Sequence, residues 1–193
     1  MKDRLIIGIT GASGVIYGIR LLEILKDIQT IETSLILSSS AQKNIGIETK
    51  YSAEQVKQLA DVVYDENNHA AAIASGSFIT KGMIVIPCTI KTLSAIANSY
   101  NENLLVRAAD VTLKESRKLI VVPRETPLHK GHLKLLLQLA DIGGIIIPPV
   151  PAFYHQPKHI TDIIDQTIGK ILDQFDIQHN LFKRWSNVGA PDL

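Results

Sequence analysis

The segment 5–18 constrains the fold most strongly, because it reads Leu-Ile-Ile-Gly-Ile-Thr-Gly-Ala-Ser-Gly-Val-Ile-Tyr-Gly. This pattern predicts a buried strand that runs into a glycine-rich turn at the start of a helix. Gly11 and Gly14 allow a ligand to approach the backbone, Ser13 adds a hydroxyl, and the N–H groups of the helix would point at negative charge. The glycine spacing fits neither the dinucleotide fingerprint nor the P-loop. The turn therefore favours the phosphate of a mononucleotide or a flavin, with a plain tight turn as the alternative.

Short apolar runs alternate with segments of helical periodicity along the rest of the chain. We predict strands at 5–9, 33–37, 83–86, 119–122 and 145–147, and helices at about 14–27, 39–46, 53–60, 90–97, 104–117, 127–141 and 160–175. Ser52 and Gln55 predict a capping box. Thr126 followed by Pro127 predicts the start of the helix that Gly143 would end. The alternation is typical of an α/β fold with a doubly wound, mostly parallel sheet between two helical layers, here a single domain over residues 1–193.

The composition argues against several classes of function. The 193 residues are 46% hydrophobic, and the net charge of +1 includes no long run of lysines or arginines, which disfavours nucleic acid as a partner. The longest apolar stretches are well short of the roughly 20 residues of a membrane-spanning helix. The six histidines show no metal-site spacing, so we expect no metal. Cys88 is the only cysteine, and we expect a buried thiol in a cytoplasmic protein that contacts no membrane.

Polar residues follow the predicted strands, and the ligands of a doubly wound sheet bind at the carboxyl ends of its strands. These positions are Gly11, Ala12 and Ser13, then Ser38, Ser39 and Ser40, then Thr89, Ile90, Lys91 and Thr92, and finally Arg124 and Glu125. Hydroxyls, helix N-termini and one arginine together suit a phosphate and a polar heterocycle. Taken singly, each serine is more often a helix cap.

Other candidate residues lie outside that edge. Arg107, Asp110 and Lys114 would share one helix face, either as a row of surface ion pairs or with the two basic residues flanking a second phosphate. Glu48 lies at a predicted helix end, where a solvated or capping carboxylate is the simpler interpretation. Tyr154 offers a π face and a hydroxyl. Trp185 could serve core packing, a subunit contact or an aromatic cage, with packing the simplest interpretation.

Several segments in this order resemble the UbiX family of flavin prenyltransferases, including proteins once labelled small subunits of aromatic acid decarboxylases. The resemblance covers nearly the whole chain, and its carriers are residues 10–14, 47–49, 75–78, 86–93, 107–110, 113–115, 122–127 and 149–157. It implies a flavodoxin-like or Rossmann-like flavoprotein that assembles into trimers and commonly dodecamers, with the segment 176–193 in subunit contacts. The implied reaction joins dimethylallyl phosphate to N5 and C6 of reduced FMN. A UbiD-type decarboxylase would use the prenylated FMN, in ubiquinone biosynthesis or aromatic acid metabolism.

The resemblance also implies roles for individual residues. The implied FMN contacts are Gly11, Ala12, Ser13, Ser38, Thr89, Ile90, Lys91, Thr92 and Arg124. The implied catalytic residues are Ser13, Glu48, Lys114 and Glu125, and the implied donor-binding residues are Arg107, Lys114, Tyr154, Lys170 and Trp185. Lys170 stands where the family usually has an arginine. Lysine keeps the positive charge but lacks the two-pronged fork of a guanidinium. Subunits share the family's pocket, so one chain need not bring all of these residues together.

These residue types suit the implied chemistry. Lys114, Arg107 and Lys170 would stabilise the departing phosphate without a metal. Tyr154 and Trp185 would face the allylic cation, and Glu48, Ser13 and Glu125 would move protons.

Two alternatives stay open at this point. One is an FMN-dependent decarboxylase of a cysteine-containing substrate, although no counterpart of its usual histidine follows Ser40. The other is a non-catalytic FMN carrier in a decarboxylase complex, which would have no need of a second phosphate site at Arg107 and Lys114.

Overall fold

The computed structural model describes residues 2–185, and its chain forms two compact units, Met1–Pro148 and Pro149–Leu193. The first unit contains a six-stranded sheet in the order β3-β2-β1-β4-β5-β6, and every neighbouring pair is parallel. Its strands are β1 (Asp3–Ile9), β2 (Ile31–Leu37), β3 (Val62–Tyr64), β4 (Gly82–Cys88), β5 (Lys118–Pro123) and β6 (Ile145–Ile146). The predicted doubly wound, parallel α/β fold is therefore confirmed.

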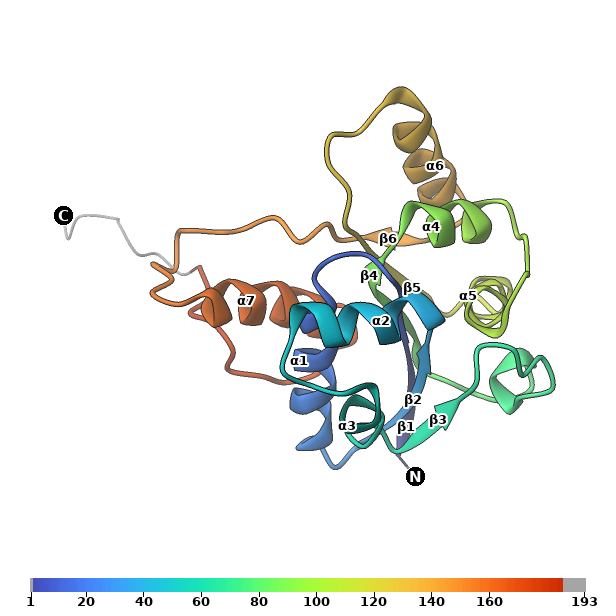
Figure 1. Cartoon of the computed structure of the whole chain (residues 1–193), viewed down its shortest axis with the longest axis horizontal. Helices are drawn as coiled ribbons and strands as arrows, with labels where there is room; N and C mark the ends of the chain where they lie inside the picture. The colour runs from blue at the N-terminus through green and yellow to red at the C-terminus, as the bar shows by residue number, and fades with distance from the viewer. Residues whose placement is uncertain (1, 186–193) are drawn as a thin grey trace. The chain divides into compact units, whose positions relative to one another are not determined.

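Helices cover both faces of this sheet (Figure 1). The helices α1 (Val15–Lys26), α2 (Ser39–Glu48) and α3 (Ala53–Lys57) lie on one face, and α4 (Ile90–Ala97), α5 (Leu104–Lys114) and α6 (Lys130–Asp141) lie on the other. A short 3-10 helix, η1 (Ala72–Ala74), packs against α5. The strand order reverses direction between β1 and β4, which places the crevice of a doubly wound fold at the carboxyl ends of these two strands.

Two local predictions are wrong. The strand β3 was not predicted, because its three residues, Val-Val-Tyr, form an edge strand too short to show an alternating pattern. Asp61 fixes β3 beside β2 by accepting hydrogen bonds from the N–H of Thr33 at 2.7 Å and from its hydroxyl at 2.9 Å. The start of α6 is also misplaced, because Nδ1 of His129, rather than the Thr126 hydroxyl, accepts the first N–H groups of this helix.

Other local signals are confirmed. Ser52 and Gln55 form the predicted capping box of α3, and α6 ends just before Gly143, whose φ of 97° is left-handed. None of the helices in residues 2–185 combines the length and apolar character needed to cross a bilayer.

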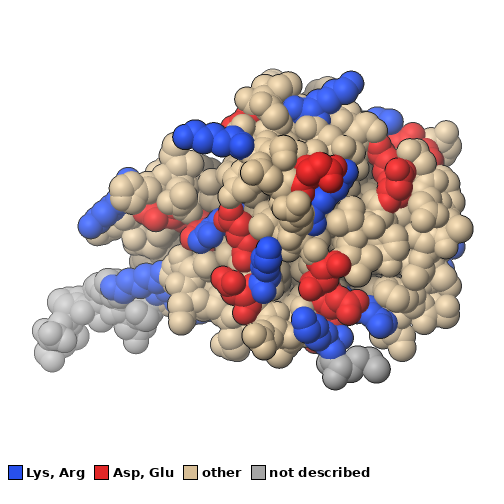
Figure 2. Space-filling view, turned by 60° about the horizontal axis from the view of Figure 1, so that its bottom comes forward, with Lys and Arg blue, Asp and Glu red and all other residues tan. Residues whose placement is uncertain are grey.

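On the face drawn in Figure 2, basic and acidic side chains are interspersed rather than gathered by sign.

The second unit contains α7 (Ile160–Asp173). Its predicted apolar face is largely buried, at Ile164, Ile168, Ile171 and Leu172, whereas Ile160 in the first turn is exposed. Gly169 allows the following segment to approach the helix, because a Cβ there would lie 2.4 Å from Phe182 and 2.6 Å from His179.

The close packing of α1 on the sheet gives a first prediction. A Cβ at Gly18 would lie 2.6 Å from the carbonyl oxygen of Ile86 and 2.7 Å from Cδ1 of Ile9. We expect Gly18→Ala to lower the free energy of unfolding by about 1–3 kcal/mol, because α1 must shift away from the sheet. The matched control is Gly46→Ala in α2, where a Cβ meets nothing within 4 Å. This control should raise the free energy of unfolding by roughly 0.5–1 kcal/mol, as Ala does in a helix interior. Chemical denaturation measures both, and equal effects would contradict the packing argument.

Candidate functional site

Three loops meet in a hollow of about 310 Å³ at the carboxyl edge of the sheet. The hollow is lined by Thr10 and Gly11 after β1, by Ser38, Ser39 and Ser40 after β2, by Thr89, Lys91 and Thr92 after β4, and by Glu66, Glu102 and Asn103. The structure thus brings together many of the residues that the sequence analysis assigned to FMN. Ala12, Ser13 and Ile90 belong to the same loops, and Arg124 follows β5 beside them, with its N–H donating to the Cys88 carbonyl at 3.2 Å.

The glycine-rich turn at the start of α1 holds an anion from the chain itself. One carboxylate oxygen of Glu48 accepts hydrogen bonds from the N–H groups of Gly14 at 2.8 Å and Val15 at 3.2 Å. Gly14 has a φ of 98°, which aims these N–H groups outward. A Cβ at Gly11 would lie 2.3 Å from Cβ of Ser40, so the glycine also lets the β1 and β2 loops touch. Glu48 therefore caps the N-terminus of α1.

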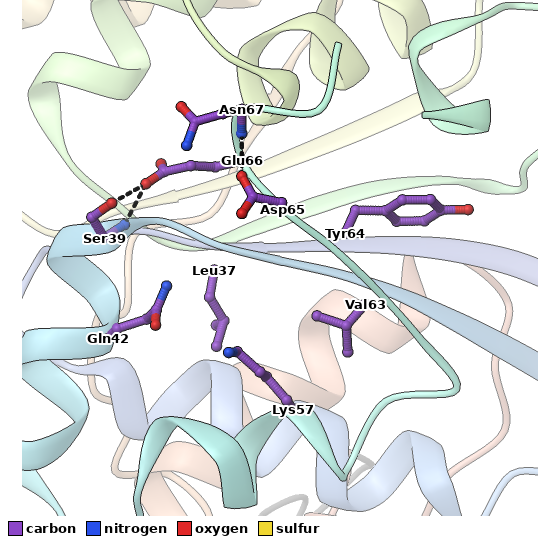
Figure 3. A pocket seen from close by; sticks show the side chains of 9 residues that line it. All are labelled: Leu37, Ser39, Gln42, Lys57, Val63, Tyr64, Asp65, Glu66 and Asn67. Carbon is purple, nitrogen blue, oxygen red and sulfur yellow. Dashed lines mark hydrogen bonds between the residues drawn. The ribbon is translucent and has the colours of Figure 1, made fainter. Parts of the chain in front are cut away.

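A second carboxylate occupies the start of α2. Glu66 accepts hydrogen bonds from the N–H of Ser39 at 2.7 Å and from the Ser39 hydroxyl, while the Ser38 hydroxyl accepts from the N–H of Ala41 at 3.1 Å. Glu66 and Ser39 also line a neighbouring hollow of about 190 Å³ beside β3, where both side chains point toward each other (Figure 3). Glu66 was not predicted as a site residue, because the strand before it has only three residues and was not predicted either.

The start of α4 differs from the other two helix N-termini. Thr89 accepts a hydrogen bond from the N–H of Thr92 at 3.1 Å, and its own N–H donates to the Thr10 hydroxyl at 2.9 Å. No carboxylate among residues 2–185 caps this helix. Lys91 in its first turn is 77% exposed at the side chain and pairs with Glu102 at 3.2 Å. A helix N-terminus with a lysine and hydroxyls, and without a capping carboxylate, attracts an external anion.

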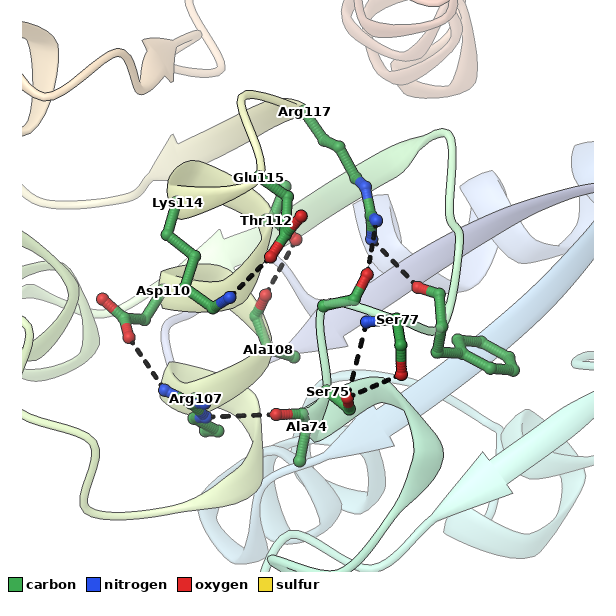
Figure 4. A network of polar contacts seen from close by, with 12 residues as sticks. Ala74, Ser75, Ser77, Arg107, Ala108, Asp110, Thr112, Lys114, Glu115 and Arg117 are labelled. Atoms are coloured by element: carbon green, nitrogen blue, oxygen red, sulfur yellow. Dashed lines mark hydrogen bonds and ion pairs between the residues drawn. The ribbon is translucent and has the colours of Figure 1, made fainter.

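The predicted basic face of α5 forms ion pairs within the chain (Figure 4). Arg107 pairs with Asp110 at 3.1 Å and donates to the Ala74 carbonyl at 3.2 Å. Lys114 pairs with Glu115 at 2.5 Å, and this hydrogen bond lowers the pKa of the Glu115 carboxyl. Arg117 donates to the carbonyl oxygens of Gly76 and Phe78, which fastens the 75–78 segment to the end of α5.

Lys114 lies at the opposite edge of the sheet from the hollow. The helix α5 begins next to Asn103, which lines the hollow, and ends at Lys114, four residues before β5 starts. Eleven helical residues span about 16 Å. A single chain therefore does not bring Lys114 to Glu48.

Glu125 and Cys88 lie at the carboxyl edge without a shared polar network. Glu125 is exposed and accepts a hydrogen bond from the N–H of Thr126 at 3.2 Å. Cys88 is fully buried, and this burial raises the pKa of its thiol, as expected for an unreactive cysteine. Within residues 2–185 the structure contains no cluster of three or more side chains able to hold a metal ion.

The second unit brings two of the predicted donor-binding residues into contact. The rings of Tyr154 and Trp185 meet edge to face, with centroids 5.7 Å apart, beside a hollow of about 140 Å³. Gln166 of α7 donates to the Tyr154 hydroxyl at 3.4 Å, and Lys170 follows it by one helical turn on an exposed position. Trp185 is 73% exposed, so the core-packing interpretation is wrong.

The chain is similar to known flavoproteins over nearly its whole length. The family model named Flavoprotein matches residues 1–186. The chain is 55% identical over 187 residues to the flavin prenyltransferase UbiX of Salmonella typhimurium, which covers 96% of this chain and 99% of that protein. The structure matches AnUbiX (PadA1), solved in complex with FMN and dimethylallyl pyrophosphate, with a TM-score of 0.96 at 43% identity, covering 98% of this chain and 100% of that one.

Two further solved structures show how far the similarity extends, one at high and one at low sequence identity. A dodecameric FMN-dependent UbiX-like decarboxylase from Escherichia coli matches with a TM-score of 0.93 at 46% identity, covering 95% of this chain and all of that one. The peptidyl-cysteine decarboxylase EpiD matches with a TM-score of 0.61 at only 22% identity, covering 79% of this chain and 84% of that one, which shows a common fold alone. Because high identity extends along nearly all of both sequences, the chain belongs to the UbiX family of flavin prenyltransferases.

Proposed function

We propose that this flavin prenyltransferase transfers the dimethylallyl group of dimethylallyl phosphate to N5 and C6 of reduced FMN. The observation that carries the proposal is the 55% identity over 96% of the chain to a flavin prenyltransferase. A relative at 43% identity was solved with FMN and dimethylallyl pyrophosphate, which supports the same pair of ligand classes here. The prenylated FMN would then serve a UbiD-type decarboxylase, and we expect the protein to work in the cytoplasm.

The charges at the sheet edge support one placement of the FMN phosphate. Glu48 and Glu66 already occupy the N-termini of α1 and α2, and their charges would repel a phosphate there. The N-terminus of α4 offers N–H groups together with Thr89, Lys91 and Thr92, and the charge of the nearby Glu102 is offset by its ion pair with Lys91. We therefore assign the phosphate to Thr89, Ile90, Lys91 and Thr92. The remaining flavin contacts would come from Gly11, Ala12, Ser13, Ser38 and Arg124.

We assign Glu48 to proton exchange with the departing phosphate. Its Oε2 atom receives both N–H groups of the α1 turn, which fixes the carboxylate and leaves Oε1 for proton exchange. Ser13, in the same turn, and Glu125, at the end of β5, would assist proton loss during ring closure. In these assignments the glycine-rich turn before α1 binds the Glu48 carboxylate and does not bind a phosphate.

The donor phosphate would be held by cations. Arg107, Lys114 and Lys170 each carry a positive charge able to stabilise the phosphate as it leaves, in the role that a metal plays elsewhere. Tyr154 and Trp185, which already contact each other, would present π faces to the allylic cation.

The separation of Glu48 from Lys114 supports a site shared between subunits. Because the two residues lie at opposite edges of one sheet, Lys114 would reach the hollow from another copy of the chain. A dodecameric relative at 46% identity is consistent with an assembly of this kind, which we propose to be a dodecamer built from trimers.

Mixed oligomers test the shared site directly. Glu48→Gln and Lys114→Ala should each abolish most prenylation alone. In a one-to-one mixture, about a quarter of sites built from two copies would combine an intact Glu48 with an intact Lys114, so activity should return toward that fraction. The measurement is the rate of prenylated FMN formation after joint refolding or coexpression.

The control for the mixed oligomers replaces Glu48→Gln with the double variant Glu48→Gln/Lys114→Ala. No site in that mixture with Lys114→Ala contains an intact Lys114, so it should stay inactive. Absence of recovery in the first mixture, with intact mixed oligomers, would contradict a shared site.

The lysine at position 170 gives a second test. Lys170→Ala should raise the donor KM by roughly 10–100-fold, the effect of losing a charge-assisted hydrogen bond, while the FMN Kd stays unchanged. Lys170→Arg should retain activity, since arginine also binds phosphate. The control is Lys134→Ala on the exposed face of α6. An unchanged donor KM and kcat in Lys170→Ala would mean that Lys170 is a solvated residue of α7.

A further inference from the structure

Arg184 is held by two hydrogen bonds at the end of α7. Its Nη1 donates to Oδ2 of Asp173 at 2.9 Å, and its Nη2 donates to Oδ1 of the same carboxylate at 2.6 Å. This is the bidentate arrangement in which a guanidinium and a carboxylate fix each other's orientation as well as position. Arg184 is the residue immediately before Trp185.

The segment between Asp173 and Arg184 packs closely on α7. His179 is 3% exposed at its side chain, and its Nε2 lies 3.1 Å from Oδ1 of Asp173. Phe182 lies next to His179 and below the guanidinium of Arg184, with the two rings 5.5 Å apart. Both rings occupy the space that the missing Cβ of Gly169 leaves open. The path of the chain from α7 to Arg184 is therefore fixed at several points.

Tyr154, which contacts Trp185, is also hydrogen-bonded to α7. Tyr154 receives a hydrogen bond from Gln166, which is 6% exposed, and Tyr154 meets Trp185 edge to face. Gln166, Lys170 and Asp173 are spaced by four and three residues, so they lie along one face of the helix. One face of α7 thus holds Tyr154 through Gln166 and the residue before Trp185 through Asp173. Lys170 lies between Gln166 and Asp173 on this face.

We propose that Asp173 and Arg184 are positioning residues that hold Trp185 against Tyr154 for use by the prenyl donor. This inference rests on the proposed function, because it assigns the donor to the two rings. Neither residue touches the reacting atoms. Their role is to keep the Trp185 ring at a fixed place at the end of a segment that His179 and Phe182 already pack against α7.

The charge state of the pair suits a permanent clamp. The hydrogen bond from Arg184 is the largest influence on Asp173 and lowers the pKa of its carboxyl below the ordinary value. The carboxylate is then ionised throughout the neutral range, and the clamp weakens only as the pH falls through that lowered pKa. Because the Arg184 side chain is 56% exposed, solvent screens the pair and its main effect is orientation rather than stability.

The test uses Trp185 as its own reporter, because it is the only tryptophan in the chain. In the full-length oligomer, Arg184→Gln and Asp173→Asn should lower the fluorescence anisotropy of Trp185 on the nanosecond timescale. Arg184→Lys keeps one hydrogen bond and should give an intermediate value. Lys183→Gln removes the same charge one residue earlier, outside the clamp, and should leave the anisotropy unchanged.

Kinetics then separate positioning from general structural damage. Arg184→Gln should reduce kcat/KM for dimethylallyl phosphate by about tenfold or more, as misplaced contacts do, with the FMN Kd and the oligomeric state unchanged. An unchanged anisotropy in both clamp variants would overturn the proposal, as would a lowered anisotropy with normal donor kinetics. A wild-type protein that forms no prenylated FMN would instead contradict the proposed function, while the anisotropy comparison would still report on the clamp.

Discussion

Parallel strands bring the N-termini of α1, α2 and α4 to one edge of the sheet, so three sets of unpaired N–H groups compete for anions in a small region. The chain satisfies two of these sets with its own carboxylates, Glu48 on α1 and Glu66 on α2. The third, on α4, keeps hydroxyls and a lysine. This division of anions directs an external phosphate to α4 and leaves Glu48 anchored for proton transfer.

The same geometry explains why the proposed active site needs more than one chain. In a doubly wound fold each helix runs back along its strand, so the two ends of α5 lie at opposite edges of the sheet. Arg107 and Lys114 are paired with Asp110 and Glu115 in the isolated chain. In the proposed assembly a phosphate from the donor would compete with these carboxylates for the two cations. Oligomerisation is thus part of the catalytic chemistry that we propose, rather than an addition to it.

The sequence predicted the sheet, most helices and the loops that line the hollow, because strand-and-helix alternation and cap residues are local signals. It missed β3 and Glu66, since a three-residue edge strand carries no periodicity and its consequences appear only when β3 pairs with β2. Helical spacing correctly indicated that Arg107 and Lys114 share a face, but spacing carries no information on which sheet edge each residue approaches. Of the three roles that the sequence leaves open for Trp185, core packing is the simplest because tryptophan is usually well buried, but the exposed ring meets Tyr154 instead.

The central claim is that this chain modifies FMN rather than using it as a redox or decarboxylation cofactor. The most direct measurement is mass spectrometry of the flavin after anaerobic incubation of the protein with reduced FMN and dimethylallyl phosphate. The account predicts a flavin whose mass has increased by one dimethylallyl unit, formed only when the protein and both substrates are present. A flavin of unchanged mass, with the donor intact and FMN bound, would contradict it.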